Sequence, residues 1–392
     1  MNTHNLLMKQ SQAMTRRQMI KSSVALAALA FAQSPLRSFG FKEPEQTDLV
    51  LPFLDQQPVG KMLRWEQLTD WITPTADVFH VQHYGVPEFD AAKWQLDISG
   101  LVKKPRTLTL ADLKARKRST LAATLECSGN GSGAGFMGAI GNVRWTGTRL
   151  APLLEECSPL KRGIEVVFFG MDEKVEKIRE KDYAQHFARS LAISDALRDE
   201  VLLAYEMNGE PLTKNHGAPV RLIVPGWFGI AWVKWLARIE VMDRRYMSKY
   251  MAREYVTIRG EERDGTTIWR ETSVGPMDVK SIVARAVRRP DGTVRFSGAA
   301  WTDGTPLKTV EVKINDGKWL PASLDQTQAS KYSWTFFNFD WKNPAPGEHT
   351  VVSRATDREG RMQPAADDPQ IKLKRTYWEA NQQWPRKIRL VL

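Results

Sequence analysis

The chain has 392 residues, of which 42% are hydrophobic and 26% charged, and it contains 14 tryptophans. This composition is typical of a globular protein with a large packed interior and excludes a disordered or fibrous chain; the length favours two folded units. The formal net charge is +11, but four basic residues lie in the first 32 residues (Lys9, Arg16, Arg17 and Lys21), which leaves +7 for the remainder. Those remaining charges are scattered among acidic residues, so we expect a small anion or an acidic protein as partner and no nucleic acid.

Residues 1–32 carry the pattern of an export signal. The paired Arg16 and Arg17 precede a short Ala-rich apolar run, and Ala30-Phe31-Ala32 provides a small-x-small cleavage site. The run is too short to span a bilayer, and no later stretch approaches about 18 apolar residues. The sequence therefore predicts a twin-arginine signal peptide and a soluble periplasmic protein without a membrane span, with an ordinary amphipathic helix as the alternative. Because this route exports folded proteins, the leader is a first indication of a cofactor.

Residues 33–64 contain Pro and Gln without periodicity, so they are expected to form an extended arm, with order beginning near Trp65. From 65 to 275, short strand and helix patterns alternate, which is typical of a mixed α/β or α+β domain. The strand candidates are 94–100, 121–127, 165–170, 201–207 and 220–226. The helix candidates are 108–116 with Thr109 as N-cap, 148–157 and 183–197.

The sequence pattern changes near residue 280 from alternating strands and helices to strands alone. Strand patterns separated by DG, PG and EG turn signals occupy 279–287, 294–303, 309–324, 331–341 and 349–360. Their spacing predicts an immunoglobulin-like β-sandwich over residues 276–392. The overall prediction is an α+β fold in which a catalytic domain, 65–275, precedes this sandwich.

Cys127 stands at the end of an apolar strand candidate and is followed by a glycine-rich turn. The chain has one other cysteine, Cys157. In an oxidising compartment the two could form a disulfide, but a cysteine in front of such a turn also suits an accessible thiolate. The residues alone leave both interpretations open.

Three further segments carry candidate chemistry: HGAPVR (216–221), PGWFGIAWVKW (225–235) and YMSKYMAREY (246–255). His216 and Arg221 lie close enough in sequence to bind a phosphate together. Each segment alone is more typical of an ordinary structural role, because a lone His is usually a satisfied structural residue and PGW usually forms a turn.

In order and spacing, however, these segments resemble the sulfite oxidase family of molybdenum enzymes over roughly residues 65–390. The most specific matches are TLECSGN (124–130), RWTGTRL (144–150), AYEMNGEPL (204–212) and the HGAPVR segment followed by VPG and VKW. The resemblance implies that the Cys127 thiolate binds molybdenum, which leaves Cys157 as an unpaired thiol at a helix end. The expected cofactor is Mo-molybdopterin.

The resemblance also implies roles for further residues. His216 and Arg221 would hold the terminal phosphate of the pterin, and Asp172 would bond to its polar edge. Tyr255 would lie beside the oxo group of the metal. The remaining expected contacts of the cofactor are the segment beneath it, Phe79, His80, Val81, Gln82 and His83, and the segment that lines its phosphate, Trp232, Val233 and Lys234.

Two departures from the family pattern concern the substrate. Animal and plant members carry arginines where this chain has Val81 or Gln82, and Gly131. Two contacts to an oxyanion would therefore be missing unless another cation compensates. The candidates for this compensation are Lys249, Arg253 and Arg144.

The resemblance implies oxidation of sulfite or a related reduced sulfur compound by oxo transfer. The sequence lacks C-x-x-C-H and His-Pro-Gly-Gly signatures, so no haem is expected in this chain, and a periplasmic cytochrome c or similar protein would accept the electrons. Reduction of S- or N-oxides, and a non-catalytic periplasmic binding module, are the alternatives. The sandwich is expected to form a homodimer, with Trp334, Phe336 and Phe337 as exposed interface aromatics.

Overall fold

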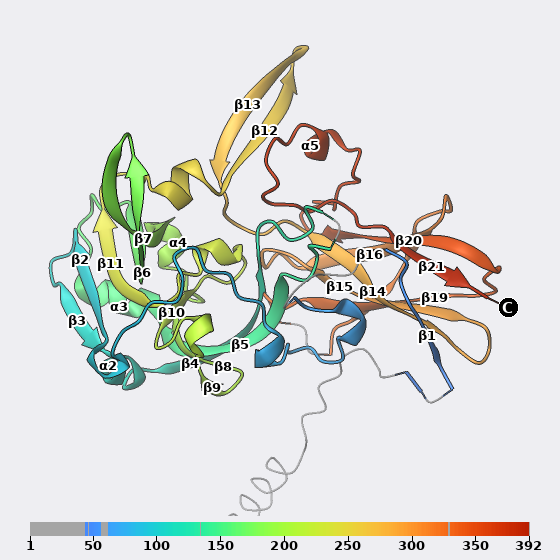
Figure 1. Cartoon of the computed structure of the whole chain (residues 1–392), viewed down its shortest axis with the longest axis horizontal. Coiled ribbons are helices and arrows are strands. Elements are labelled where there is room, and N and C mark those ends of the chain that lie inside the picture. The colour runs from blue at the N-terminus through green and yellow to red at the C-terminus, as the bar shows by residue number, and fades with distance from the viewer. Residues whose placement is uncertain (1–43, 46, 56–61, 134, 328–329, 392) are drawn as a thin grey trace, which may run out of the picture. The chain divides into compact units, whose positions relative to one another are not determined.

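The computed structural model describes residues 44–391 apart from 46, 56–61, 134 and 328–329. The predicted signal peptide, 1–32, lies outside the described residues, and so does much of the predicted arm. Phe39–Leu392 forms one compact unit. Within its described part the fold is α+β, with mostly β content and short helices (Figure 1).

Two sheets build the first part of this unit. One has the order β10-β8-β5-β4, with β9 paired to β8, and all its neighbours are antiparallel. The other has the order β3-β2-β11-β6-β7, in which β2 and β11 run parallel. Their strands are β2 Gln95–Gly100, β3 Arg106–Thr109, β4 Arg118–Glu126, β5 Ile140–Arg149, β6 Glu165–Ile178, β7 Lys181–Ala192, β8 Leu202–Met207, β9 Glu210–Pro211, β10 Arg221–Ile223 and β11 Leu236–Met242.

The helical segments are short. The α-helices are α2 Leu110–Lys114, α3 Leu150–Cys157, α4 Ile193–Ala196 and α5 Pro369–Lys372. The 3₁₀ turns are η1 Trp65–Gln67, η2 Thr75–Asp77, η3 Ala91–Lys93, η4 Lys214–His216 and η5 Gly229–Ala231, and the single π-helical turn among the described residues is η6 Lys249–Arg253. Site residues therefore sit mostly on turns and strand ends rather than on long helices.

Two of the three predicted helices are confirmed. Thr109 caps α2 in a reciprocal capping box with Asp112, and α3 ends at Cys157. The helix predicted over 183–197 is wrong, because residues up to Ala192 form strand β7, which pairs with β6 from Ile178 to Glu165. Pairing along the whole strand outweighs the local helix preference of this segment, and only α4 remains helical.

Two antiparallel sheets form the C-terminal part. Their orders are β1-β14-β15-β19-β18 and β17-β16-β20-β21. The strands are β1 Leu49–Leu51, β14 Lys280–Arg288, β15 Val294–Trp301, β16 Leu307–Ile314, β17 Leu320–Pro321, β18 Ser323–Asp325, β19 Thr335–Trp341, β20 Gly347–Asp357 and β21 Arg386–Leu390. Both sheets contribute to one apolar core, for example Phe296 and Phe337 from the first and Val312 and Val351 from the second. Order begins before Trp65, because β1 belongs to the predicted arm.

Aromatic packing joins the C-terminal sheets to the first part. Trp65 stacks on Trp301 with ring centroids 5.9 Å apart, and Trp71 stacks on Phe336 at 4.5 Å. The backbone N–H of Trp334 donates to the Thr124 hydroxyl on β4 at 2.8 Å.

The predicted interface aromatics are therefore internal. Trp334, Phe336 and Phe337 are 0%, 1% and 0% exposed. Trp334, just before β19, and Phe336 pack into one core while Phe337 packs into the other, so the expectation that these three residues are exposed is wrong.

A two-stranded hairpin, β12 Val256–Arg263 and β13 Thr266–Ser273, projects from the body of the described unit (Figure 1). It begins directly after Tyr255, so the expected site tyrosine lies at its base. None of the helices in the described ranges has the length and apolarity needed to cross a membrane.

Candidate active site

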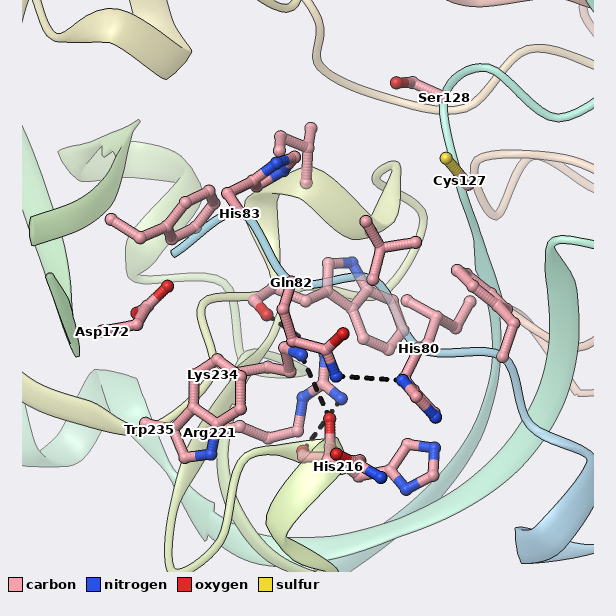
Figure 2. Close-up of a pocket in the computed structure, with 18 of the residues that line it drawn as sticks. His80, Gln82, His83, Cys127, Ser128, Asp172, His216, Arg221, Lys234 and Trp235 are labelled. Carbon is pink, nitrogen blue, oxygen red and sulfur yellow. Dashed lines mark hydrogen bonds between the residues drawn. The ribbon is translucent and has the colours of Figure 1, made fainter. Parts of the chain in front are cut away.

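One pocket collects every predicted site residue except Val233 (Figure 2). Its predicted lining residues are Phe79, His80, Val81, Gln82, His83, Cys127, Asp172, His216, Arg221, Trp232, Lys234 and Tyr255. They come from segments spread over more than 170 positions of sequence, so the fold and not local sequence brings them together. The side chain of Val233 is buried in the hydrophobic core instead, and its carbonyl accepts the Leu222 N–H at 2.8 Å.

The Cys127 thiol lies on one wall of the pocket, where β4 ends in a tight turn. The Cys127 N–H donates to the Ala139 carbonyl at 2.9 Å, and the Asn130 N–H donates back to the Cys127 carbonyl at 2.9 Å. A side chain at Gly129 would meet the Tyr377 ring at 3.1 Å, so the glycine is needed for close packing. Cys127 and Cys157 are both free thiols, which excludes the disulfide in this structure.

Two cationic side chains, the buried Arg221 and the half-buried Lys234, lie apart from this thiol at the other end of the pocket (Figure 2). Arg221 is 3% exposed and donates to the carbonyls of His216 and Trp232, both at 3.1 Å, while its Nε has no partner among the described residues. Lys234 donates to the Asn215 carbonyl at 3.0 Å. Burial lowers the pKa of Arg221 to about 9, and burial together with the Arg221 charge lowers the pKa of Lys234 to about 7. This end of the pocket is therefore suited to an anion.

His216 closes the same end in its neutral form. Its Nε2 donates to the Val78 carbonyl at 3.2 Å, so its Nδ1 accepts from the Thr213 hydroxyl at 2.7 Å. Burial, and then the Arg221 charge, lower the pKa of His216 to about 4. The neighbouring His80 is held by Gln82, whose amide donates to His80 Nδ1 at 2.9 Å. These contacts fix both rings, and the neutral His216 adds no positive charge.

Asp172 has a buried carboxylate oxygen that accepts no hydrogen bond from the described residues. It is 3% exposed, and its Oδ1 has no hydrogen-bond partner among the described residues. Burial raises the pKa of Asp172 to about 6. Ser128, next to the cysteine, also has a buried hydroxyl without a partner in the described chain. Since buried polar groups are normally paired, these pocket atoms have hydrogen-bonding capacity available for a ligand.

Tyr255 approaches the Cys127 side of the pocket from the base of the hairpin. Its hydroxyl and His83 Nε2 share a hydrogen bond at 3.1 Å, and its ring stacks on Trp378 at 4.0 Å. Burial raises the pKa of Tyr255 well above its usual range, and burial together with the Lys234 charge lowers the pKa of His83 to about 4. Phenol and imidazole are therefore both neutral near pH 7, and the phenol keeps its proton.

Sequence reasoning missed several residues of the pocket: Leu125, Ser128, Phe187, Asn215, Gly229, Ile230 and Trp235. Ser128, Asn215 and Trp235 directly follow or precede predicted site residues, so their position in the sequence could have identified them. Phe187 was hidden by the wrong helix assignment. The Trp378 ring on Tyr255 comes from a segment more than 100 residues away and carried no local signal.

The three cations named as candidates to compensate for the missing arginines do not line this pocket. Lys249 pairs with Glu176 at 2.8 Å and Glu254 at 3.4 Å. Arg253 lines a separate hollow beside the β6–β7 hairpin, and Arg144 is exposed on β5. Among the described residues, none of these three candidates therefore compensates for the missing arginines within the pocket.

Comparisons with known proteins identify a domain type and several relatives. A family model described as "Oxidoreductase molybdopterin binding domain" matches residues 83–250. Mitochondrial sulfite oxidase of Homo sapiens is 29% identical over 364 residues, which cover 85% of this chain and 63% of that protein. Sulfite oxidase of Arabidopsis thaliana is 28% identical over 336 residues, which cover 76% of this chain and 83% of that protein.

A solved structure extends the likeness to the C-terminal part. The sulfane dehydrogenase SoxCD from Paracoccus pantotrophus matches with a TM-score of 0.71 and 26% sequence identity, over 92% of this chain and 95% of that one. The chain spans less than two thirds of the human protein's length. Family model, relatives and structure agree: residues 83–250 match a molybdopterin-binding oxidoreductase domain, and the chain is similar to sulfite oxidases and to a sulfane dehydrogenase.

Proposed function

We propose that this protein is a periplasmic molybdenum enzyme that oxidises sulfite or a related reduced sulfur compound and passes the electrons to an external cytochrome c. The observation that carries the proposal is the pocket shared by the Cys127 thiol, the buried Arg221 and the half-buried Lys234. A thiol at one end and cations at the other suit a cofactor with a metal at one end and a phosphate at the other.

The unpaired atoms of the pocket fit Mo-molybdopterin. Arg221 Nε has no partner in the described chain, so a phosphate oxygen would complete its hydrogen bonds, and Lys234 and His216 lie beside it. Asp172 Oδ1 would accept an N–H of the pterin. Cys127 would bind the metal as a thiolate; burial raises the pKa of its free thiol, so the metal itself would have to favour deprotonation. When bound, the cofactor supplies two-electron oxo-transfer chemistry.

The residues of the chain would position the reactants and manage one proton. Tyr255 keeps its phenol proton, and with His83 Nε2–H as the donor to Tyr255 Oη that proton would be free to donate to an oxygen near Cys127 and would be retained during turnover. Phe187, Ile230 and Leu125 give this side of the pocket an apolar wall, which limits water. These groups orient a small substrate without adding charge.

The charge distribution favours a substrate other than a tightly held dianion. Arg221 and Lys234 are the only Arg or Lys side chains that line the described pocket, and both are assigned to the cofactor. A sulfite dianion would therefore lack its own cation, and we expect a high Michaelis constant for sulfite. A sulfane-type sulfur compound fits this wall better, in keeping with the likeness to a sulfane dehydrogenase.

The remaining parts of the proposal rest on sequence. The twin-arginine pattern, Arg16 and Arg17, supports export of the folded, cofactor-loaded chain to the periplasm. The lack of haem signatures supports an external electron acceptor. We further propose that the C-terminal sheets form an immunoglobulin-like sandwich that mediates homodimerisation, through surfaces other than the buried aromatics of β19.

An oxidation assay tests the proposal. The protein is purified from a host that makes the cofactor, and its molybdenum is measured per chain. Turnover is compared for sulfite and thiosulfate with ferricyanide or cytochrome c as electron acceptor, and for sulfoxides with a reduced viologen dye as electron donor. We expect near-stoichiometric molybdenum and oxidation of a reduced sulfur compound. Turnover with sulfoxides alone would establish the reverse chemistry, and a folded protein without molybdenum would indicate a non-catalytic module.

A further inference from the structure

A buried ion pair lies directly behind the Cys127 turn. Lys280, the first residue of β14, donates from Nζ to Glu126 Oε1 at 2.8 Å and also to the Asn130 carbonyl. The Lys280 and Glu126 side chains are 2% and 1% exposed. Since Glu126 precedes Cys127 and Asn130 follows it by three positions, the lysine joins both ends of the turn that carries the thiol.

Further hydrogen bonds hold the Glu126 carboxylate in place. Glu126 Oε2 accepts the Trp301 indole N–H at 2.7 Å, and Oε1 also accepts the Asn130 amide at 3.0 Å. The Asn130 carbonyl oxygen of the side chain accepts the Ala139 N–H at 3.0 Å. Ala139 in turn accepts the Cys127 N–H, so the network closes on the cysteine backbone. Lys280 and Trp301 both belong to the C-terminal sheets.

The turn is also shaped around the ammonium group. Gly131 adopts φ +93°, and a Cβ at this position would lie 2.9 Å from Lys280 Nζ and 3.1 Å from the Met137 sulfur. A side chain at residue 131 would therefore displace the lysine. Glycine permits both the backbone conformation and the close approach.

Stability alone gives no reason for this arrangement. A buried ion pair loses hydration on folding, and apolar residues of similar volume are often equally stabilising. A hydrogen-bonded ion pair can, however, fix a backbone geometry better than apolar residues can. We propose that Lys280 is a positioning residue for the metal ligand: through Glu126 and Asn130 it fixes the direction of the Cys127 thiol, and thereby makes the C-terminal sheets part of the metal site. The inference rests on the proposed function, because a fixed thiol direction matters when Cys127 binds a metal.

The test removes both charges together. Lys280→Met with Glu126→Gln avoids leaving one buried charge unpaired. Arg285→Met is the matched control, because Arg285 lies on the same strand, is 4% exposed and donates to the carbonyls of Glu66 at 3.0 Å and Leu68 at 2.7 Å, remote in sequence from the Cys127 turn.

Two readouts are compared in parent, double variant and control. The first is the limiting rate of Cys127 alkylation by iodoacetamide over a pH series, in full-length protein made without the cofactor; the limit at high pH reports access rather than ionisation. The second is molybdenum per folded chain in protein made with the cofactor. We expect the limiting alkylation rate to rise about tenfold in the double variant as the turn opens, with a fall in bound molybdenum, while Arg285→Met keeps the parent values.

The proposal would be overturned if the limiting rate of Cys127 alkylation is unchanged in the folded double variant, or if it changes equally in Arg285→Met. If the double variant does not fold, Trp301→Phe removes one N–H bond to Glu126 and is read in the same way, with a smaller rise expected. The two hypotheses fail separately. A parent protein that never binds molybdenum contradicts the proposed function, whereas the alkylation comparison still decides whether Lys280 positions the thiol.

Discussion

Arg221→Met separates the stability of the fold from the binding of the cofactor. The lowering of the Arg221 pKa from 12.5 to about 9 corresponds to a burial cost of about 5 kcal/mol. Its two bonds to carbonyl oxygens, at 3.1 Å each, contribute about 1.5–3 kcal/mol apiece. The two contributions nearly cancel, so the cofactor-free variant should keep the parent's free energy of unfolding within about 2 kcal/mol. The cation that holds the phosphate is nevertheless lost.

The assay measures thermal unfolding of the cofactor-free protein and molybdenum per chain of the loaded protein. We expect the Arg221→Met midpoint within about 4 °C of the parent and at least about tenfold less molybdenum. Arg189→Met is the control: this arginine is 1% exposed, lies outside the pocket, and donates to Tyr250, Ser273 and Val274. The control should lose more stability but keep its molybdenum when folded. Full molybdenum in Arg221→Met, or a larger loss of stability than in Arg189→Met, would refute the reasoning.

Three further changes test other parts of the account. The Lys234 proton is released near pH 7 in the folded chain and near pH 10.5 in the unfolded chain, so between these values the unfolded chain binds one proton more. Urea unfolding of cofactor-free protein should therefore show that the parent gains stability relative to Lys234→Met as the pH rises through this range. A stability difference that stays constant over the range would contradict this prediction. Tyr255→Phe removes the hydroxyl bonded to His83 and should lower turnover about 100-fold with molybdenum retained; parent-like steady-state turnover would exclude the proton role. Thr109→Ala removes the α2 cap and should cost about 1 kcal/mol in chemical unfolding without changing molybdenum content.

The sequence predicted those features that depend on short, local patterns. Thr109 and Asp112 form a capping box wherever a helix starts there, and an apolar run bounded by turn residues forms a strand in either domain. The spacing of His216 and Arg221 is also local, since one turn brings the Arg221 guanidinium to the His216 carbonyl. For such features the neighbouring residues supply most of the determining contacts.

The structural features that the sequence did not predict depend on long-range packing, that is, on which core each face of a strand packs against. Residues 183–192 contain helix-compatible residues, but pairing with β6 makes them a strand and turns Phe187 into the pocket. Trp334 and Phe336 face one core and Phe337 the other, so an aromatic run that suggests an interface is wholly internal. Lys280 contacts Glu126 across 154 positions, a pairing that no local pattern encodes.

The central claim is a bond between the Cys127 sulfur and molybdenum, and X-ray absorption at the molybdenum K-edge measures it most directly. The spectrum of the loaded parent protein is compared with that of Cys127→Ser, a variant that should keep the fold and lose turnover because a hydroxyl is a much weaker ligand for this metal. We expect one sulfur neighbour fewer around the metal in the variant. An unchanged number of sulfur neighbours, with parent-like turnover, would contradict the account.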